Sequence, residues 1–124
     1  MIAPILLIED NQSNADMVIR VLNAAGYQVV HSLTGMDGVH LAREALPALI
    51  LIDFDLPDID ARTLILTLKK QLDSDGAPPL VALTARTGDA EMQMAARYGC
   101  RAFVSKPFTP QELTQAVDTL LAVP

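Results

Sequence analysis

Five short apolar runs, separated by longer segments with helical spacing of apolar residues, constrain the fold of this chain more than any other feature. The runs are rich in Ile, Leu and Val and carry almost no polar residues, which is typical of strands buried on both faces. They lie at residues 5–8, 27–30, 49–52, 80–83 and 102–104. Strands that alternate with helices in this way predict an α/β fold, in which a five-stranded parallel sheet is covered by helices on both faces.

A helix is expected after each of the five runs. The last one has the clearest signals, because Thr109 and Glu112 match a capping box and Pro110 occupies the first helical position. Asp60 is a plausible N-cap for the third helix. The other four helices are expected at about 12–25, 36–45, 61–72 and 89–98.

The charge of the chain argues against several classes of partner. Fifteen acidic residues against nine Lys and Arg give a formal charge of −6, the wrong sign for attraction to nucleic acid or to an anionic membrane. No apolar run approaches the roughly 20 residues of a membrane span. Cys100 is the single cysteine, so no internal disulfide can form, which fits a reducing compartment. We therefore expect a cytoplasmic protein without nucleic-acid or membrane contacts, for which a cationic partner or a metal ion fits better.

Polar residues stand at or just beyond the carboxyl ends of four of the five runs. They are Glu9 with Asp10, then Asp53, Thr84 and Lys106. The carboxyl ends of parallel strands meet at one edge of a sheet, where ligands bind at the topological switch point. In a flavodoxin-like strand order, 2-1-3-4-5, the first and third strands are neighbours. Asp10 and Asp53 should therefore face each other.

This set of side chains suits phosphoryl chemistry. Facing carboxylates repel each other, and a shared Mg²⁺ is the usual remedy. Thr84 offers a hydroxyl donor and Lys106 a positive charge, so Asp53 could act as a nucleophile toward phosphorus. Each residue alone also has an ordinary explanation in a turn or at a helix start. The combination at four strand ends favours a phosphoryl site.

The chain resembles the receiver domains of bacterial two-component response regulators over essentially its whole length. The resemblance rests on four motifs: residues 5–11, residues 49–53 with Pro57 four positions on, residues 82–85, and residues 103–108. It implies a stand-alone receiver domain over residues 1–124, since no segment is left for an output domain.

The resemblance also implies roles for the acidic residues. Asp53 would accept a phosphoryl group from the phosphohistidine of a sensor histidine kinase or a histidine phosphotransfer protein. Asp10 would bind Mg²⁺ directly and Glu9 through water, and the main-chain carbonyl of Asp55 would complete the protein ligands. By this resemblance the chain is a phosphoacceptor in a two-component phosphorelay, and it assists its own phosphorylation and dephosphorylation without being an enzyme.

The remaining motif residues would sense and transmit the aspartyl phosphate. Thr84 and Lys106 would contact phosphoryl oxygens, and the Lys106–Pro107 peptide bond is expected to be cis. Phe103 falls at the aromatic switch position of the family. The signal would leave through the surface of the fourth helix, fifth strand and fifth helix toward a downstream protein effector.

Two other functions compete with this interpretation. A haloacid-dehalogenase-like phosphatase is suggested by Asp53 and Asp55, two acids two positions apart. However, Pro57 stands where that motif usually has Thr or Val, the motif follows the third strand instead of the first, and the chain is short for that family. A docking module that has the receiver fold but is not phosphorylated is the other alternative, although none of the key polar residues is missing.

Asp55 and Arg86 fill two positions that vary within the family and flank the acceptor. We hypothesise that they pair across the mouth of the site and slow hydrolysis of the phosphoryl group. The competing view is that Asp55 orients the attacking water and speeds hydrolysis. His31 and His40 lie far in sequence from the acidic residues, and we expect both to have surface or packing roles.

Overall fold

Five strands and five helices alternate along the chain in the computed structural model, which describes residues 3–72, 77–85 and 88–121. All strand pairs are parallel, and the order across the sheet is β2-β1-β3-β4-β5, so the predicted flavodoxin-like topology is confirmed. In chain order the elements are β1 (Ile5–Ile8), α1 (Gln12–Ala24), β2 (Val29–Ser32), α2 (Gly35–Ala45), β3 (Leu49–Asp53), α3 (Ala61–Gln71), β4 (Leu80–Thr84), α4 (Asp89–Arg97), β5 (Cys100–Ser105) and α5 (Pro110–Leu121).

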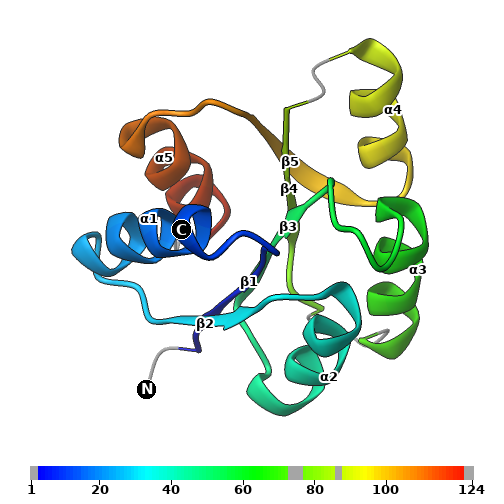
Figure 1. Ribbon diagram of the computed structural model, residues 1–124, viewed down its shortest axis with the longest axis horizontal. Coiled ribbons are helices and arrows are strands. Elements are labelled where there is room, and N and C mark those ends of the chain that lie inside the picture. Colours follow the sequence, from blue (N-terminus) through cyan, green and yellow to red (C-terminus); the bar gives the residue numbers. More distant parts are fainter. Residues whose placement is uncertain (1–2, 73–76, 86–87, 122–124) are drawn as a thin grey trace.

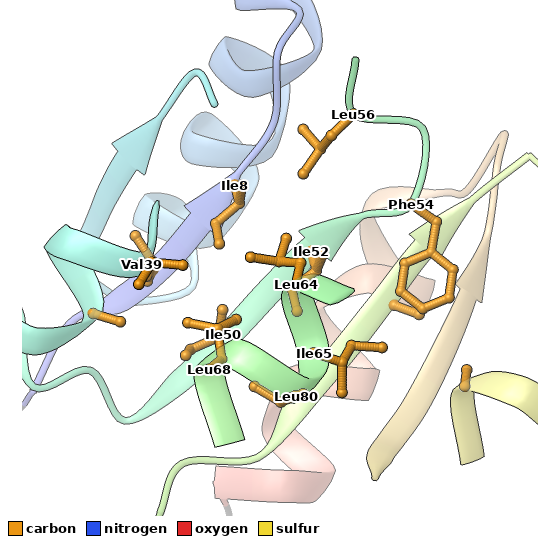
Figure 2. Packing of buried hydrophobic residues seen from close by; sticks show 14 residues of the cluster. Ile8, Val39, Ile50, Ile52, Phe54, Leu56, Leu64, Ile65, Leu68 and Leu80 are labelled. Carbon is orange, nitrogen blue, oxygen red and sulfur yellow. The ribbon is translucent and has the colours of Figure 1, made fainter. Parts of the chain in front are cut away.

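The helices cover both faces of the sheet. Helices α1 and α5 lie on one face, and α2, α3 and α4 lie on the other (Figure 1). Alternate residues of β1 and β3 point to opposite faces, so Leu6 and Ile50 belong to one core cluster and Leu7 and Leu51 to the other. Figure 2 shows the first cluster, in which side chains of the sheet pack against those of α3. The central strands are therefore buried on both sides, as their unbroken apolar runs predict.

The second strand differs from its prediction. We expected it at residues 27–30, whereas β2 spans Val29–Ser32 and pairs with β1 in the register Ile5↔Val29 to Ile8↔Ser32. Tyr27 belongs instead to the turn after α1, because its main-chain N–H donates to the carbonyl of Leu22 at 3.0 Å. Strand β2 lies at an edge and is only half-buried over three of its four residues, so its hydrophobic pattern does not fix where it begins.

The predicted helix ends are largely confirmed. At the start of α5 the Thr109 N–H donates to Glu112 Oε1, and the Glu112 N–H donates to Thr109 Oγ1, both at 3.1 Å. Asp60 caps α3 by accepting the Thr63 N–H at 2.9 Å. Helix α2 begins at Gly35, one residue earlier than predicted. Over the described parts of the chain no helix combines the length and the apolar character needed to cross a bilayer.

Helix α2 packs unusually closely on the strand that leads to the acidic residues. A Cβ atom placed on Gly38 would lie 2.5 Å from Cδ1 of Ile8, so only glycine fits there without a shift. The N-terminus of α2 is also tied to the β3–α3 loop, because the main-chain N–H groups of Gly35 and Met36 donate to the two carboxylate oxygens of Asp58 at 3.0 and 3.1 Å. Both contacts hold α2 beside the loops that carry the candidate site.

Candidate functional site

Three carboxylates meet at the carboxyl ends of β1 and β3. The register pairs Ile8 with Ile52, so Glu9 and Asp10, which follow β1, lie beside Asp53 at the end of β3. One carboxylate oxygen from each acid lies within 4.8 Å of those of the other two. Glu9 and Asp53 are 1% and 2% exposed, and Asp10 is exposed. The fold thus brings together the acidic residues that the sequence pattern singled out.

Lys106, which directly follows β5, adds a positive charge to this cluster. Its Nζ lies 3.2 Å from Asp53 Oδ1 and 3.6 Å from Glu9 Oε1. The main-chain N–H of Lys106 donates to the carbonyl of Thr84 at 2.8 Å, which fixes the end of β5 against the end of β4. Thr84 is fully buried at the end of β4, and the Lys106–Pro107 peptide bond is cis.

The two buried carboxyl groups have opposite pKa shifts. Burial raises the pKa of Glu9 from 4.5 to about 8, helped by its hydrogen bond to Asp53 and by the negative charge there, while Lys106 acts in the opposite direction. Burial also acts to raise the pKa of Asp53, but the hydrogen bond to Glu9, the Asp55 N–H and the charge of Lys106 outweigh it and lower that pKa. The raised pKa of Glu9 favours a proton on that carboxyl group, and the lowered pKa of Asp53 favours its ionised form.

The donor set fits a hard divalent cation. Carboxylate oxygens are the ligands that Mg²⁺ prefers, and a cation that replaced the proton on Glu9 would balance the charge of the cluster. Asp55 lies in the loop directly after Asp53, and its main-chain N–H donates to Asp53 Oδ1 at 2.9 Å. That bond and Lys106 together fix the orientation of the Asp53 carboxylate.

An apolar pocket adjoins the acidic cluster. It has a volume of about 340 Å³ and lies between α1 and the segment that joins β5 to α5. Glu9 and Lys106 line it on the side of the cluster, and Met17, Val18 and Phe108 supply apolar surface. Met17 is 36% exposed. Apolar surface therefore adjoins the acidic cluster on this side.

Two side chains that contact the loops of the site were missed by sequence reasoning. His31, expected to have a surface or packing role, lies with Nε2 2.8 Å from the main-chain oxygen of Glu9. Asp58 binds the N-terminus of α2, as described above. The misplaced start of β2 hid the first contact, because the true register sets His31 beside Leu7, two residues from Glu9. Arg86, which we expected to pair with Asp55, lies outside the residues that the structure describes.

Comparison with known proteins identifies relatives along nearly the whole chain. The family model of the response regulator receiver domain matches residues 5–118. The polar-differentiation response regulator DivK of Brucella anthropi is 28% identical over 117 residues, which cover 94% of each chain. These matches agree with the receiver-domain resemblance and give no support to the phosphatase alternative.

Solved structures with the same fold include two informative examples. The chemotaxis protein CheY4 of Vibrio cholerae superposes with a TM-score of 0.89 and 25% identity, over 98% of this chain and 100% of that one. The receiver domain of the sensor histidine kinase PA1611 of Pseudomonas aeruginosa PAO1 superposes with a TM-score of 0.85 and 25% identity, over 99% and 100% of the two chains. That second structure has a magnesium ion coordinated in its active-site cleft.

Proposed function

We propose a phosphoacceptor function for this chain, which belongs to the response regulator receiver domain family. In this proposal Asp53 takes a phosphoryl group from the phosphohistidine of a sensor histidine kinase or a histidine phosphotransfer protein. The observation that carries the proposal is the buried Asp53 carboxylate, whose pKa is lowered and whose Oδ1 lies 3.2 Å from Lys106 Nζ. An ionised carboxylate beside a fixed cation is a nucleophile prepared for a phosphoryl group.

The transfer follows from the positions of the side chains. An oxygen of Asp53 attacks phosphorus, the bond from phosphorus to the donor imidazole nitrogen breaks, and the electron pair of that bond stays on the imidazole. The product is an aspartyl phosphate. Lys106 compensates the negative charge that the phosphoryl oxygens bring, and the Thr84 hydroxyl donates to one of them. Glu9, Asp10, Asp53 and the carbonyl of Asp55 would hold Mg²⁺, which when bound would supply further positive charge against the transferred group.

The phosphodonor partner would dock over the acidic cluster. The apolar pocket beside Glu9 and Lys106 supports this placement, because an apolar side chain of the donor protein could fill it while its phosphohistidine reaches Asp53. We further propose a cytoplasmic location and a protein effector as the output partner, without direct binding to nucleic acid. The net charge of −6 supports the last point.

Phosphorylation by a small donor tests the proposal without the unidentified kinase. The wild type, Asp53→Asn and Asp10→Asn are incubated with acetyl phosphate and Mg²⁺, with and without a chelator, and intact masses are recorded. We expect one phosphoryl adduct on the wild type only, and its loss with the chelator. Asp16→Asn, at an exposed acid of α1, is the matched control and should behave as the wild type. A full-yield adduct on Asp53→Asn would contradict the assignment.

A phosphatase would behave differently in a second assay. An enzyme of that class would release phosphate from an aryl phosphate through many turnovers, whereas a phosphoacceptor of the proposed kind does not process such a substrate efficiently. Sustained turnover that depends on Asp53 and Asp55 would overturn the proposed function.

A further inference from the structure

The imidazole of His31 lies against the turn that joins β1 to α1. Register places His31 beside Leu7, and the His31 ring reaches past Ile8 to the main-chain oxygen of Glu9, with Nε2 2.8 Å from that oxygen. The ring is half-buried at this point. This contact joins residues 22 positions apart, so it depends on the fold and not on local sequence.

The chemistry of the two atoms fixes the direction of this hydrogen bond. A carbonyl oxygen can only accept, so Nε2 of His31 must carry a proton and donate it. Residues of β2 therefore bind both main-chain polar groups of Glu9. His31 donates to its carbonyl, and its N–H donates to the carbonyl of Ser32 at 3.0 Å. The first of these two bonds is made by a side chain, and the second is the ordinary continuation of the sheet.

The carbonyl that His31 holds has a particular place in the site. It belongs to the peptide unit that links Glu9 to Asp10, the two residues after β1 whose carboxylates join the acidic cluster. A rotation of this peptide plane would change the direction in which the Asp10 side chain projects from the main chain. Mg²⁺ requires near-ideal octahedral geometry at short distances, so a displaced ligand weakens its binding. A group that fixes this peptide thus acts on the cation without touching it.

We propose that His31 is a positioning residue for the divalent cation: its Nε2–H fixes the peptide between Glu9 and Asp10 and so sets the geometry of the Mg²⁺ ligands. The inference rests on the proposed function, in that it takes Glu9 and Asp10 as ligands. It goes beyond that function in assigning a role to a side chain of the edge strand.

Two substitutions of His31 separate the effect of its hydrogen bond from the effect of its packing. In glutamine, Nε2 is as many bonds from Cβ as Nε2 of histidine, so His31→Gln retains a donor at the same reach, whereas His31→Leu retains bulk without a donor. Mg²⁺ affinity is measured for each full-length variant by titration calorimetry, and unfolding in urea is measured with a chelator present. We expect His31→Leu to bind Mg²⁺ about tenfold more weakly, the lower end of the loss typical for outer-shell partners. His31→Gln should bind nearly as the wild type does.

Each outcome decides a different point. His40→Leu, which alters the exposed histidine of α2, should leave Mg²⁺ affinity unchanged. Unchanged affinity in His31→Leu, or an equal loss in His31→Gln and His31→Leu, would overturn the role of the donor, while a wild type that does not bind Mg²⁺ would contradict the proposed function instead. If His31→Leu does not fold, the wild type still gives an answer through long-range ¹H–¹⁵N correlations of the imidazole. A ring protonated on Nε2 supports the proposal, and a neutral ring protonated only on Nδ1 would overturn it.

Discussion

Phe54 and Phe103 pack edge to face, with ring centroids 6.2 Å apart and an interplanar angle of 85°. Phe54 directly follows Asp53, and its main-chain N–H donates to the carbonyl of Leu83 at 2.9 Å. Phe103 lies in β5, at the position that the family resemblance marks as the aromatic switch. The proposed acceptor, Asp53, is therefore joined by one peptide bond to Phe54, whose ring packs on the proposed switch residue Phe103.

The ring contact should appear as a coupling energy. Phe54→Leu, Phe103→Leu and the double variant form a double-mutant cycle, measured by urea unfolding. Edge-to-face pairs contribute about 0.5 to 1.5 kcal/mol beyond their buried area, so the two single effects should fail to add by roughly that amount. The pair Phe54→Leu and Phe108→Leu is the control, because Phe108 packs against the other core cluster. Additive effects in the first cycle would show that the ring geometry contributes nothing.

The contact between Phe54 and Phe103 also concerns the route by which a signal would leave the site. If Thr84 moves toward the phosphoryl group and Phe103 follows, a two-state equilibrium shifts at the α4–β5–α5 surface. The coupling should be modest, about 1 to 3 kcal/mol. Adding beryllofluoride, a phosphoryl mimic, should change amide chemical shifts from Asp53 through Phe103 to α4. Changes restricted to the loops that carry Asp10 and Asp53 would argue against such a switch.

Local and long-range features of this fold differ in how far the sequence predicts them. The capping box of Thr109 and Glu112 is predictable because both partners lie within one helical turn. The convergence of the acidic residues follows from strand order alone. The contact of His31 with Glu9 needs a register, and the half-buried edge strand β2 has too weak a pattern to supply one. Asp58 looks like an ordinary loop acid until α2 is placed beside it, 23 residues away in sequence from Gly35.

Gly38 should resist a substitution that normally stabilises helices. Replacing an interior helical glycine by alanine usually gains about 1 kcal/mol. Here the new Cβ would lie 2.5 Å from Cδ1 and 2.7 Å from Cγ1 of Ile8, which is fully buried, so the helix or the packed side chain would have to shift. We expect Gly38→Ala to lose roughly 1 to 3 kcal/mol of unfolding free energy in urea. Adding Ile8→Val, which removes Cδ1, should relieve part of the clash, and a more stable Gly38→Ala would contradict the close packing.

The thiol of Cys100 should make the stability of the protein depend on pH in the alkaline range. Burial raises the pKa of this thiol from 9.0 to about 11, with a smaller opposing effect of Lys69. The unfolded chain therefore releases the proton first as pH rises, so the contribution of Cys100 to stability is complete below pH 9 and declines toward pH 11. The free-energy difference between wild type and Cys100→Ala should shrink across this range. The rate of alkylation by iodoacetamide should rise near pH 11 in the native protein and near pH 9 in urea. A native rise near pH 9 would contradict the shift.

We expect an ion pair between Asp55 and Arg86 to lengthen the lifetime of the aspartyl phosphate. Asp55 is exposed at the mouth of the site, two residues beyond the acceptor. An exposed ion pair contributes only about 0 to 1 kcal/mol, so neither substitution should greatly change stability. Its effect on hydrolysis could be larger, because hydrolysis needs a water in line with the bond from Asp53 oxygen to phosphorus, and a closed pair would obstruct that approach.

Decay rates distinguish a gate, in which the Asp55–Arg86 pair keeps water from phosphorus, from the alternative that Asp55 orients the attacking water. The phosphorylated wild type, Asp55→Ala and Arg86→Ala are followed by intact mass after the phosphodonor is removed. If the pair excludes water, both substitutions open the same approach and both should accelerate decay. If Asp55 instead orients the attacking water, Asp55→Ala alone should slow decay, because the water loses its hydrogen-bond acceptor. Unchanged or slower decay in Arg86→Ala would remove the gate, since the guanidinium would then take no part in limiting access to phosphorus.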